Sequence, residues 1–237
     1  MALTTNLVAY WKFDENTGTS AADATGNGNT GTLVGSPSWV AGKINSAVSY
    51  NGTSQYTQTG SGSSYAGLFP SAISMCAWVS YPNFSNYQRT LTLETNSTDY
   101  NVWLQANKTS ATVQFGAGGS SYKTGTTALS TNTWYFICAV TDYTQAGTHI
   151  YVNGVDDGGT FTGTPSYNAT NAYLDVGALL STGTRYYGAA TIDEVGVWSR
   201  ALTSTEVTQL YNSGAGLQYP FVASTSNAPF FLRMVTQ

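Results

Sequence analysis

A loop near the start of the chain is rich in oxygen atoms that could bind a metal ion. Residues 23–29 read DATGNGN, so carboxylate, amide and backbone carbonyl oxygens follow one another closely. Glycines let several carbonyls turn toward one centre, and Ca²⁺ takes about six to eight oxygen ligands. The loop is therefore a candidate calcium site. The alternative is a loop closed by its own Asp and Asn side chains, which bond to nearby backbone amides.

Two clusters of aromatic residues in predicted loops could contact a sugar. One is residues 81–87 (YPNFSNY), and the other is residues 185–187 (RYY). Flat apolar faces beside hydroxyl and amide groups are typical of sites for small polar ligands. The alternative is that many of the 17 tyrosines pack inside a sheet or along its edges. The candidate ligand-binding residues are Tyr81, Phe84, Tyr87, Arg185, Tyr186 and Tyr187.

No arrangement of residues in the sequence predicts catalysis. The single histidine, His149, lies in a predicted strand without a recognisable serine or cysteine nucleophile, and one histidine does not form a Cys/His zinc cluster. Glycoside hydrolysis needs two carboxylates that face one cleft. The adjacent pairs Asp156-Asp157 and Asp193-Glu194 should point to opposite sides of a strand. We therefore expect a protein that is not an enzyme and has no catalytic residues.

The composition argues against nucleic-acid and membrane partners. Charged residues make up 8% of the chain, against about 25% in an average protein. The net charge is −4, and eight scattered basic residues form no basic patch for a phosphate backbone. The N-terminal sequence MALTTNLVAYW lacks the basic and apolar segments of a secretory signal, and no run of about 18 apolar residues occurs. We expect neither a signal peptide nor membrane insertion.

Hydrophobic alternation predicts an all-β chain. Leu7, Ala9, Trp11 and Phe13 share one face of a first strand. Further strand segments recur with turn residues between them, which is typical of an antiparallel sandwich and not of alternating strands and helices. These segments are residues 47–51, 56–60, 73–81, 89–94, 101–106, 112–116, 134–141, 149–152, 172–178 and 192–199.

The last predicted strand places a carboxylate among apolar side chains. In residues 192–199, Asp193 shares one face with Val195 and Val197. A buried carboxylate is costly unless backbone N–H groups or a cation meet it. Asp193 is therefore expected to contact one or the other.

One helix is predicted directly after this strand. Thr203-Ser204-Thr205-Glu206 is a capping box, and Leu202 before the cap can pack on Val207 inside the helix. The apolar residues that follow lie on one stripe, and Gly214 is expected to end the helix.

The two cysteines, Cys76 and Cys138, both lie in apolar strand segments. Buried free thiols are favoured over a disulfide, because strand cysteines pair only where neighbouring strands bring their Cα atoms within about 7 Å. Both alternatives remain open at this point.

Motifs at both ends of the chain resemble those of laminin-G-like domains of the concanavalin A type. The C-terminal motif is IDEVGVWSRALTSTEVTQLY, and the N-terminal motif is LVAYWKFD followed by DATGNGN, WVAGK and AVSYNG. The resemblance covers roughly residues 5–217. It implies a concanavalin A-like, laminin-G-like β-sandwich (jelly roll) of two antiparallel sheets with one short C-terminal helix, forming one domain over residues 1–217. It also implies a structural Ca²⁺ whose ligands would be Asp23, Asn27, Asn29 and Asp193.

Residues 218–237 follow the helix and contain more large apolar side chains than a solvated tail should. We expect an arm that docks on another subunit or on a capsid protein. The alternatives are a segment folded back on the sandwich or a frayed terminus. The residues expected to make this assembly contact are Phe221, Phe230, Phe231, Leu232 and Met234.

Together these features predict a non-catalytic recognition protein that binds glycans or a cell-surface polysaccharide. The expected context is the surface of a virion, where the chain would be a phage capsid decoration or fibre-associated subunit and a homo-oligomer. One alternative is a purely structural virion protein without a glycan ligand. Another is a secreted bacterial adhesin or carbohydrate-binding module in the extracellular space.

Overall fold

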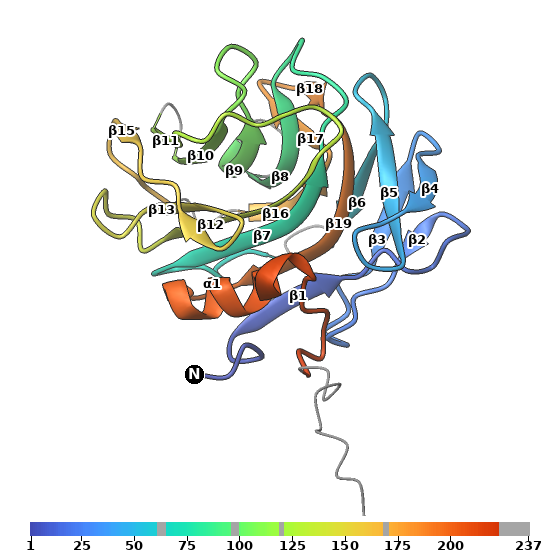
Figure 1. Cartoon of the computed structure of the whole chain (residues 1–237), viewed down its shortest axis with the longest axis horizontal. Helices are drawn as coiled ribbons and strands as arrows, with labels where there is room; N and C mark the ends of the chain where they lie inside the picture. The colour runs from blue at the N-terminus through green and yellow to red at the C-terminus, as the bar shows by residue number, and fades with distance from the viewer. Residues whose placement is uncertain (61–64, 96–99, 119–120, 168–170, 223–237) are drawn as a thin grey trace, which may run out of the picture.

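The computed structural model describes residues 1–60, 65–95, 100–118, 121–167 and 171–222, which form two large antiparallel sheets packed face to face (Figure 1). The first sheet has eight strands in the order β14-β13-β12-β7-β19-β5-β4, and β1 pairs with β19. Its strands are β1 (Leu7–Trp11), β4 (Ser38–Ala41), β5 (Ser46–Asn51), β7 (Ile73–Ser80), β12 (Trp134–Thr141), β13 (His149–Val152), β14 (Val155–Asp156) and β19 (Ala189–Trp198).

The second sheet has nine strands in the order β15-β11-β10-β9-β8-β16-β6-β3-β2. They are β2 (Ser20–Ala21), β3 (Gly31–Val34), β6 (Tyr56–Thr59), β8 (Gln88–Thr95), β9 (Tyr100–Ala106), β10 (Val113–Ala117), β11 (Tyr122–Thr124), β15 (Thr160–Thr162) and β16 (Asn171–Val176). A separate hairpin joins β17 (Ala178–Ser181) to β18 (Thr184–Tyr187). The predicted all-β sandwich is confirmed, but residues 185–187 form part of this hairpin and not a loop.

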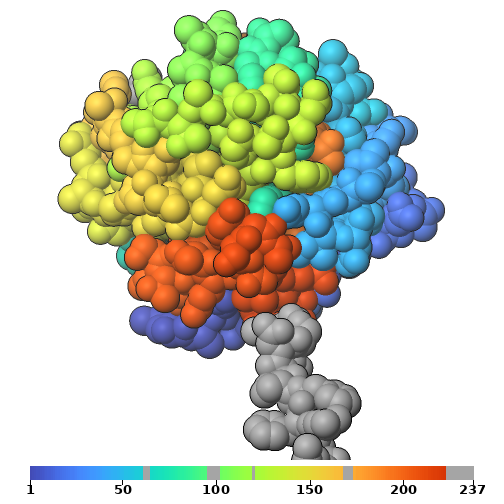
Figure 2. Space-filling view, in the orientation of Figure 1, coloured from blue at the N-terminus to red at the C-terminus, as the bar shows by residue number. Residues whose placement is uncertain are grey.

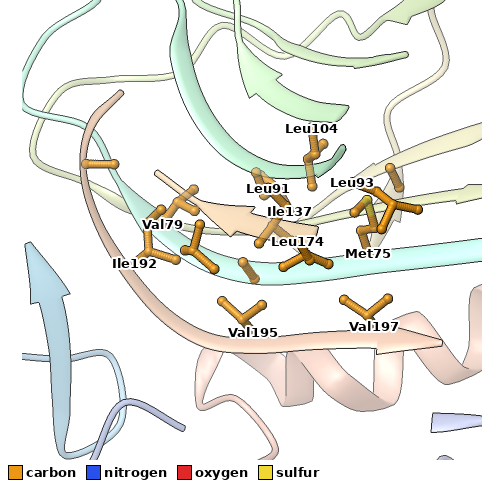
Figure 3. Packing of buried hydrophobic residues seen from close by; sticks show 14 of the residues in the cluster. Met75, Val79, Leu91, Leu93, Leu104, Ile137, Leu174, Ile192, Val195 and Val197 are labelled. Atoms are coloured by element: carbon orange, nitrogen blue, oxygen red, sulfur yellow. The ribbon is translucent and has the colours of Figure 1, made fainter. Parts of the chain in front are cut away.

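The main core lies between the two sheets. Alternate side chains of each central strand point into it, as the period of two in a strand requires. Figure 3 shows side chains of the first sheet, such as Met75, Val79 and Ile137, facing Leu91 and Leu104 of the second. This apolar layer holds the two sheets together.

The outer face of the first sheet is also buried, because the C-terminal helix α1 (Ser204–Tyr211) covers it (Figure 1). Trp78 and Trp198 on the sheet belong to one apolar cluster with Val207 and Leu210 of the helix. The central strands therefore carry apolar residues on both faces, and β7 is buried at every position from Ile73 to Val79. No helix in the described ranges is long and apolar enough to cross a membrane.

A β-bulge in β19 changes the alternation expected near Asp193. Asp193 pairs with Trp78 and Gly196 pairs with Cys76, so two residues of β19 lie opposite one residue of β7. Glu194 takes a positive φ of 51° at this point. Asp193 consequently faces the helix side, whereas Val195 and Val197 face the core between the sheets (Figure 3). The expectation that Asp193 shares a face with these two valines is wrong, because a bulge shifts a strand's period by one residue.

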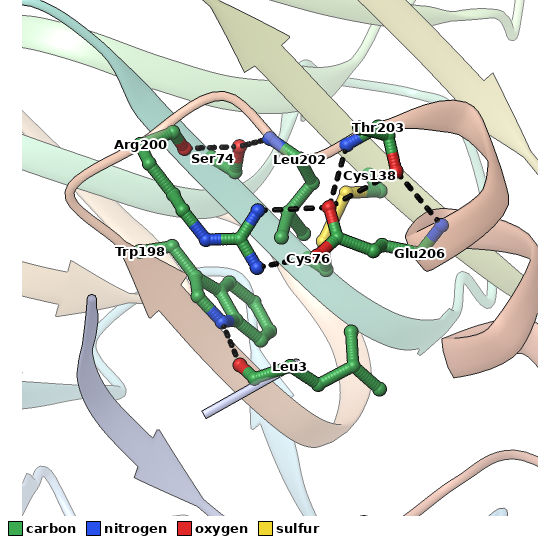
Figure 4. Close-up of a disulfide and its surroundings, with 9 residues drawn as sticks. All are labelled: Leu3, Ser74, Cys76, Cys138, Trp198, Arg200, Leu202, Thr203 and Glu206. Atoms are coloured by element: carbon green, nitrogen blue, oxygen red, sulfur yellow. Dashed lines mark hydrogen bonds and ion pairs between the residues drawn. A yellow bond between two sulfur atoms is a disulfide. The ribbon is translucent and has the colours of Figure 1, made fainter. Parts of the chain in front are cut away.

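Cys76 and Cys138 form a disulfide, so the preference for free thiols is corrected (Figure 4). The two residues are directly opposite each other in the antiparallel pair β7–β12, and their Cα atoms are 4.0 Å apart. Strand register brings them together, and register is a property that the separate strand segments do not reveal. The disulfide lies in the apolar cluster under α1.

The predicted capping box of α1 is present. The Thr203 hydroxyl accepts a hydrogen bond from the Glu206 amide at 3.3 Å, and the Glu206 carboxylate accepts one from the Thr203 amide at 2.9 Å. Arg200 also binds both Glu206 oxygens, at 2.7 and 2.8 Å (Figure 4). Although burial opposes the effect, the hydrogen bonds from Arg200 and Thr203 lower the pKa of Glu206 to about 2. The α-helix ends at Tyr211 with Asn212, left-handed with a φ of 49°, as its C-cap. A 3-10 turn, η1 (Asn212–Gly214), follows directly and ends at the predicted Gly214.

The segment after the helix belongs to the sandwich as far as the structure describes it. The Gln218 side chain donates to Asp14 at 2.8 Å and also bonds Glu194. The Phe221 ring lies 5.2 Å from that of Tyr10, between centroids, and packs within the apolar cluster under the helix. In Figure 2 the orange and red C-terminal residues adjoin the blue N-terminal segment. The domain therefore extends past the predicted boundary at residue 217.

Substitution of the N-cap residue of α1 should destabilise the protein. Thr203→Ala should lower the free energy of unfolding by about 1 kcal/mol, because the Glu206 amide loses its acceptor. The measurement is urea denaturation at neutral pH. Thr205→Ala, an exposed change inside the same helical turn, is the control and should have little effect. Equal stability of the Thr203→Ala protein and the parent would show that the cap does not form in solution.

The disulfide makes a second prediction. The double variant Cys76→Ala, Cys138→Ala should unfold with a free energy about 2–4 kcal/mol lower than that of the oxidised parent, because the cross-link constrains the unfolded chain. The reduced parent is the control and should approach the stability of the double variant. Two reactive thiols in the unreduced, denatured protein, detected by thiol titration, would contradict the pairing.

Candidate functional site

A groove of about 420 Å³ lies on the outer face of the second sheet, beside the β17–β18 hairpin. Its residues come from β8, β9, β10, β11, the hairpin and adjoining turns. Aromatic and amide side chains predominate among them, and no carboxylate is present among the described lining residues. The lining consists of Tyr87, Arg89, Trp103, Gln105, Asn107, Gln114, Tyr122, Leu179, Ser181 and Tyr186.

The alternation of side chains along strand β9 determines which of its residues form the floor of the groove. In β9, Val102 and Leu104 point into the core, so Trp103 and Gln105 point to the outer face. The Trp103 indole lies over Gly116 of the adjacent strand β10, where an added Cβ would come within 2.2 Å of the ring. Glycine at this position lets the indole lie flat against the sheet.

A row of hydrogen-bonded amides runs across the floor beside the indole. The Gln105 side chain donates to Gln114 at 3.2 Å, and Gln114 donates to the Thr124 hydroxyl at 2.9 Å. Arg89 in turn donates to Gln105. Each amide has two donor hydrogens and two acceptor lone pairs, so these bonds orient the row and leave further capacity for hydrogen bonding.

Tyrosine rings form the walls of the groove. The Arg89 guanidinium lies 5.0 Å from the Tyr87 ring and 5.9 Å from the Tyr186 ring, measured to the centroids. On the opposite side, the Trp103 and Tyr122 rings are 6.2 Å apart between centroids. Tyr186 is 47% exposed, so part of its ring is open to a ligand.

The β17–β18 hairpin is held on this face by buried charges. Arg185 forms ion pairs with Asp175 and with Glu94, the latter at 3.3 Å, and both carboxylates are fully buried. The Leu180 amide also donates to Glu94 at 2.7 Å. Burial raises the pKa of Glu94, and the neighbouring Arg185 opposes that shift. Arg185 therefore anchors one wall of the groove to the sheet.

The six predicted ligand-binding residues divide into three groups, and two of these groups line hollows. Tyr87 and Tyr186 line the groove. Arg185 and Tyr187, together with Tyr87, Arg89 and Tyr186, line a second hollow of about 270 Å³ next to it.

Tyr81 and Phe84 lie elsewhere, and the assignment of Tyr81 is corrected. Its ring is fully buried in the main core, and its hydroxyl shares a hydrogen bond of 2.7 Å with Thr90. Burial raises the pKa of Tyr81 above its ordinary value. Phe84 packs against that ring, with 5.8 Å between centroids. Both aromatic residues follow β7, where the chain still runs along the core.

Sequence reasoning missed the floor of the groove. Trp103, Gln105 and Gln114 lie within predicted strands, and no sequence motif assigns them to a site. The available signal was a tryptophan on the opposite face of its strand from Val102 and Leu104. An outward-facing tryptophan needs a partner on that face.

The predicted calcium loop is closed by its own hydrogen bonds. The Asp23 carboxylate accepts five, from the amides of Tyr10, Thr25 and Asn29 and from the side chains of Thr25 and Asn29, at 2.6–3.2 Å. The Asn29 side chain also donates to the Val8 carbonyl at 3.0 Å. These bonds leave the carboxylate little capacity for a cation.

Asn27 lies in the same loop and binds the preceding strand. Its side chain donates to the carbonyls of Leu7 and Val8, at 3.3 and 2.9 Å. The structure thus brings together Asp23, Asn27 and Asn29, in the arrangement of the hydrogen-bonded alternative.

Asp193, the fourth predicted calcium ligand, contacts a different turn. Its Oδ2 accepts a hydrogen bond from the Ile44 amide at 2.9 Å, and its buried Oδ1 has no hydrogen-bond donor. Burial raises the pKa of Asp193 to about 8, with Glu194 contributing. The donor set as arranged here does not fit one calcium ion, and the described residues contain no group of three His, Cys, Asp or Glu side chains placed to hold a metal. Calcium binding stays a prediction.

Asp193 and Glu194 face the same side of the sheet, which corrects the expectation that they point apart. The bulge turns Glu194 toward Tyr10, whose hydroxyl donates to it at 2.5 Å. Burial raises the pKa of Glu194 to about 7. The cavity beside Glu194 measures about 10 Å³, which is too small for a sugar ring. The pair is enclosed by the fold and faces no substrate-sized cleft in the described part of the chain.

The other candidate catalytic groups make structural contacts. His149 pairs with Asp156 at 2.7 Å on the surface. Asp157 accepts hydrogen bonds from the amides of Thr126 and Thr127, both at 3.0 Å. Each of these contacts ties a strand end to its neighbour.

The predicted assembly residues are only partly described. Phe221 is partly buried and packs against the Tyr10 ring of its own sandwich. Phe230, Phe231, Leu232 and Met234 lie outside the described residues. Docking on another subunit or a capsid protein stays a prediction.

A family model for the concanavalin A-like lectin/glucanases superfamily matches residues 50–208. The chain belongs to this superfamily. The match covers five of the eight strands of the first sheet in full, most of the second sheet and the whole groove. A search of curated protein sequences gives no match.

Solved structures with the same fold include domains from carbohydrate-active enzymes and toxins. Domain 4 of AbnA, a GH43 extracellular arabinanase from Geobacillus stearothermophilus solved with arabinotriose, has a TM-score of 0.67 at 22% identity, covering 86% of this chain and 97% of that domain. Trypanosoma rangeli sialidase has a TM-score of 0.68 at 16% identity, covering 91% of this chain but 34% of the enzyme. The binding domain of Paraclostridial Mosquitocidal Protein 1 has a TM-score of 0.65 at 13% identity, covering 89% of this chain and 52% of that one. At these identities the likeness concerns the fold.

The hydrogen bonds to Asp23 should stabilise the fold whether or not a metal ion is present. Asp23→Ala should lower the free energy of unfolding by about 2–3 kcal/mol, because several buried donors lose their acceptor. Urea denaturation should give the same loss in a calcium chelator and in added calcium. Asp142→Ala is the control, because the exposed Asp142 carboxylate accepts hydrogen bonds from Thr144 in its own turn, and this variant should lose less. A loss that appears only in calcium would instead support the predicted metal site.

Proposed function

We propose that the chain is a non-catalytic saccharide-binding module and that its ligand lies in the groove beside the β17–β18 hairpin. The observation that carries the proposal is the pairing of ring faces with oriented amides in one hollow. Trp103 and Tyr122 lie beside the Gln105–Gln114 row, and Tyr186 lies across from them. Concave sites that combine aromatic walls with a few placed polar groups are typical of small-molecule binding.

The chemistry of the lining suits a sugar. A sugar ring has a face of C–H groups, which packs against an aromatic ring, and a rim of hydroxyls, which both donate and accept hydrogen bonds. The side-chain amides of Gln105, Gln114 and Asn107 also donate and accept. The neighbouring hollow continues past Tyr87 and Tyr186, which gives room for a ligand longer than one residue.

The fold comparisons support this proposal without deciding the ligand. The arabinanase domain was solved in complex with arabinotriose, and this chain covers almost all of that domain. A receptor-binding domain of botulinum neurotoxin also shares the fold, at 11% identity and a TM-score of 0.65. The sialidase, an enzyme, is matched over only a third of its length.

The arrangement of acids supports binding without catalysis. Glu94 and Asp175 are on the same face as the groove, but the hairpin covers them and Arg185 pairs with both. Hydrolysis of a glycosidic bond needs two carboxylates that reach the bond from a shared cleft. The described lining of the groove has none.

The proposal is tested by saccharide binding with two matched pairs of variants. A glycan array with the full chain identifies ligands, and calorimetry measures their affinity. Tyr122→Ala and Gln114→Ala should each weaken binding about tenfold, the equivalent of about 1.4 kcal/mol, because each removes one contact type from the groove. Tyr219→Ala and Gln209→Ala are the controls. They remove the same types of side chain outside the groove, in helix α1 and in the segment after it, and should leave the affinity unchanged.

Two results would contradict the proposal. Binding that survives both groove variants would place the ligand elsewhere. The absence of any saccharide ligand, together with a symmetric oligomer or attachment to a virion, would favour the alternative of a purely structural protein.

A further inference from the structure

A row of hydrogen-bonded side chains crosses four adjacent strands of the second sheet. The register places Gln114 of β10 opposite Gln105 of β9, and Gln105 opposite Arg89 of β8. Thr124 of β11 is opposite Gln114 on the other side. Hydrogen bonds join Arg89 to Gln105, Gln105 to Gln114, and Gln114 to Thr124. The row therefore runs across the strands and not along them.

A row of aromatic residues lies beside the amides. Tyr122 of β11 is opposite Gly116 of β10, and Gly116 is opposite Trp103 of β9. Trp103 and Gln105 are two positions apart in one strand, as are Tyr122 and Thr124, so the two rows lie on one face of the sheet. Rings and amides thus follow the same direction along the groove.

The amide row is longer than one sugar unit. Neighbouring strands are about 4.8 Å apart, so four strands span about 14 Å across the sheet. One unit of a linear saccharide chain advances by about one strand spacing, so the groove has room for about three units. A single sugar would contact only part of the row.

The second hollow continues this path on the far side of β8. It shares Tyr87, Arg89 and Tyr186 with the groove, and Arg89 is the β8 end of the amide row. Beyond the shared residues, its lining includes Tyr187 of the hairpin and Thr53 of the exposed turn after β5. Figure 1 shows the strands from β11 to β8, then the hairpin and the tip of β5, in that order across the sheet.

We infer that the two hollows are subsites of one extended site, which binds linear saccharide chains long enough to pass through both. This inference rests on the proposed saccharide-binding function. The groove holds about three sugar units, and the second hollow holds the units that follow. Linked units share a single loss of translational and rotational freedom, so each further unit that makes contacts increases the affinity.

The test compares different lengths of the same saccharide chain. Disaccharides, tetrasaccharides and hexasaccharides are prepared from arabinan, xylan, cellulose, galactan and chitin, together with any linear glycan that the array detects. Calorimetry measures their affinity for the whole protein. In at least one series, the hexasaccharide should bind about tenfold more tightly than the disaccharide, because the disaccharide fits within the groove alone.

Variants of the second hollow connect this gain in affinity to its residues. Thr53→Trp should fill the hollow from the β5 turn, and Tyr187→Ala should remove a ring from its lining. Each should remove most of the gain and leave the disaccharide affinity unchanged. Ser54→Trp puts the same side chain in the same exposed turn, outside both linings, and Tyr219→Ala removes a ring elsewhere, so these two controls should keep the gain. Circular dichroism and melting curves confirm that each variant is folded.

The outcomes separate this inference from the proposed function. Equal affinity for disaccharide and hexasaccharide in every series overturns the inference. A gain that survives both Thr53→Trp and Tyr187→Ala, or an equal loss at both lengths in both variants, also overturns it. In these cases, loss of disaccharide binding in Tyr122→Ala would still uphold the groove as the saccharide site.

Two further results concern the kind of ligand. If the array and the series give only single sugars or branched glycans as ligands, the inference is wrong and the proposed function stands. If they give no saccharide ligand at any length, the function and the inference are both wrong.

Discussion

The burial of the first sheet on both faces is the constraint on which the rest of the structure depends. One face packs on the second sheet, and the other packs under α1 and the segment that follows it. A sheet covered on two sides needs apolar residues at nearly every position, as in β7. The helix cap, the disulfide and the contacts of Gln218 and Phe221 all stabilise the packing of the helix side of this sheet.

The second sheet has the opposite character, and that difference leaves room for a site. Its inner face is apolar, whereas its outer face carries Trp103, Gln105 and Gln114, and the β17–β18 hairpin covers only part of it. Polar side chains on this face bond to one another, so they keep fixed positions without a ligand. For the proposed ligand, a sheet floor with a hairpin wall would orient the binding groups in advance, which would lower the entropy lost on binding.

Buried acids serve the fold in two different ways. Glu94 and Asp175 share Arg185 and thereby fasten the hairpin to the sheet. Burial raises the pKa values of Asp193 and Glu194, and hydrogen bonds from the Ile44 amide and the Tyr10 hydroxyl stabilise the two side chains. An uncompensated charge is costly in an apolar environment, and each arrangement avoids that cost. Carboxylates of this kind therefore do not by themselves indicate catalysis.

The sequence by itself determined the features that depend on neighbours along the chain. Alternation located strands such as β12 and β13, because the two faces of a strand repeat every second residue. The capping box located the start of α1, because its hydrogen bonds join residues three positions apart. The sequence also places Asp23 and Asn29 in one polar loop, because they are only six positions apart. The motifs at the two ends of the chain also pointed to the superfamily through their resemblance to known motifs.

Only the tertiary structure decided the features that depend on register and on contacts between distant segments. The pairing of Cys76 with Cys138 required the alignment of β7 with β12. The bulge at Glu194 reversed the side to which Asp193 points, and no local pattern announces a bulge. Tyr81 and Tyr87 are similar in sequence context, yet one fills the core and the other lines the groove. The groove itself joins Arg89, Gln114 and Tyr186, whose proximity follows from the order of strands and the fold of the hairpin.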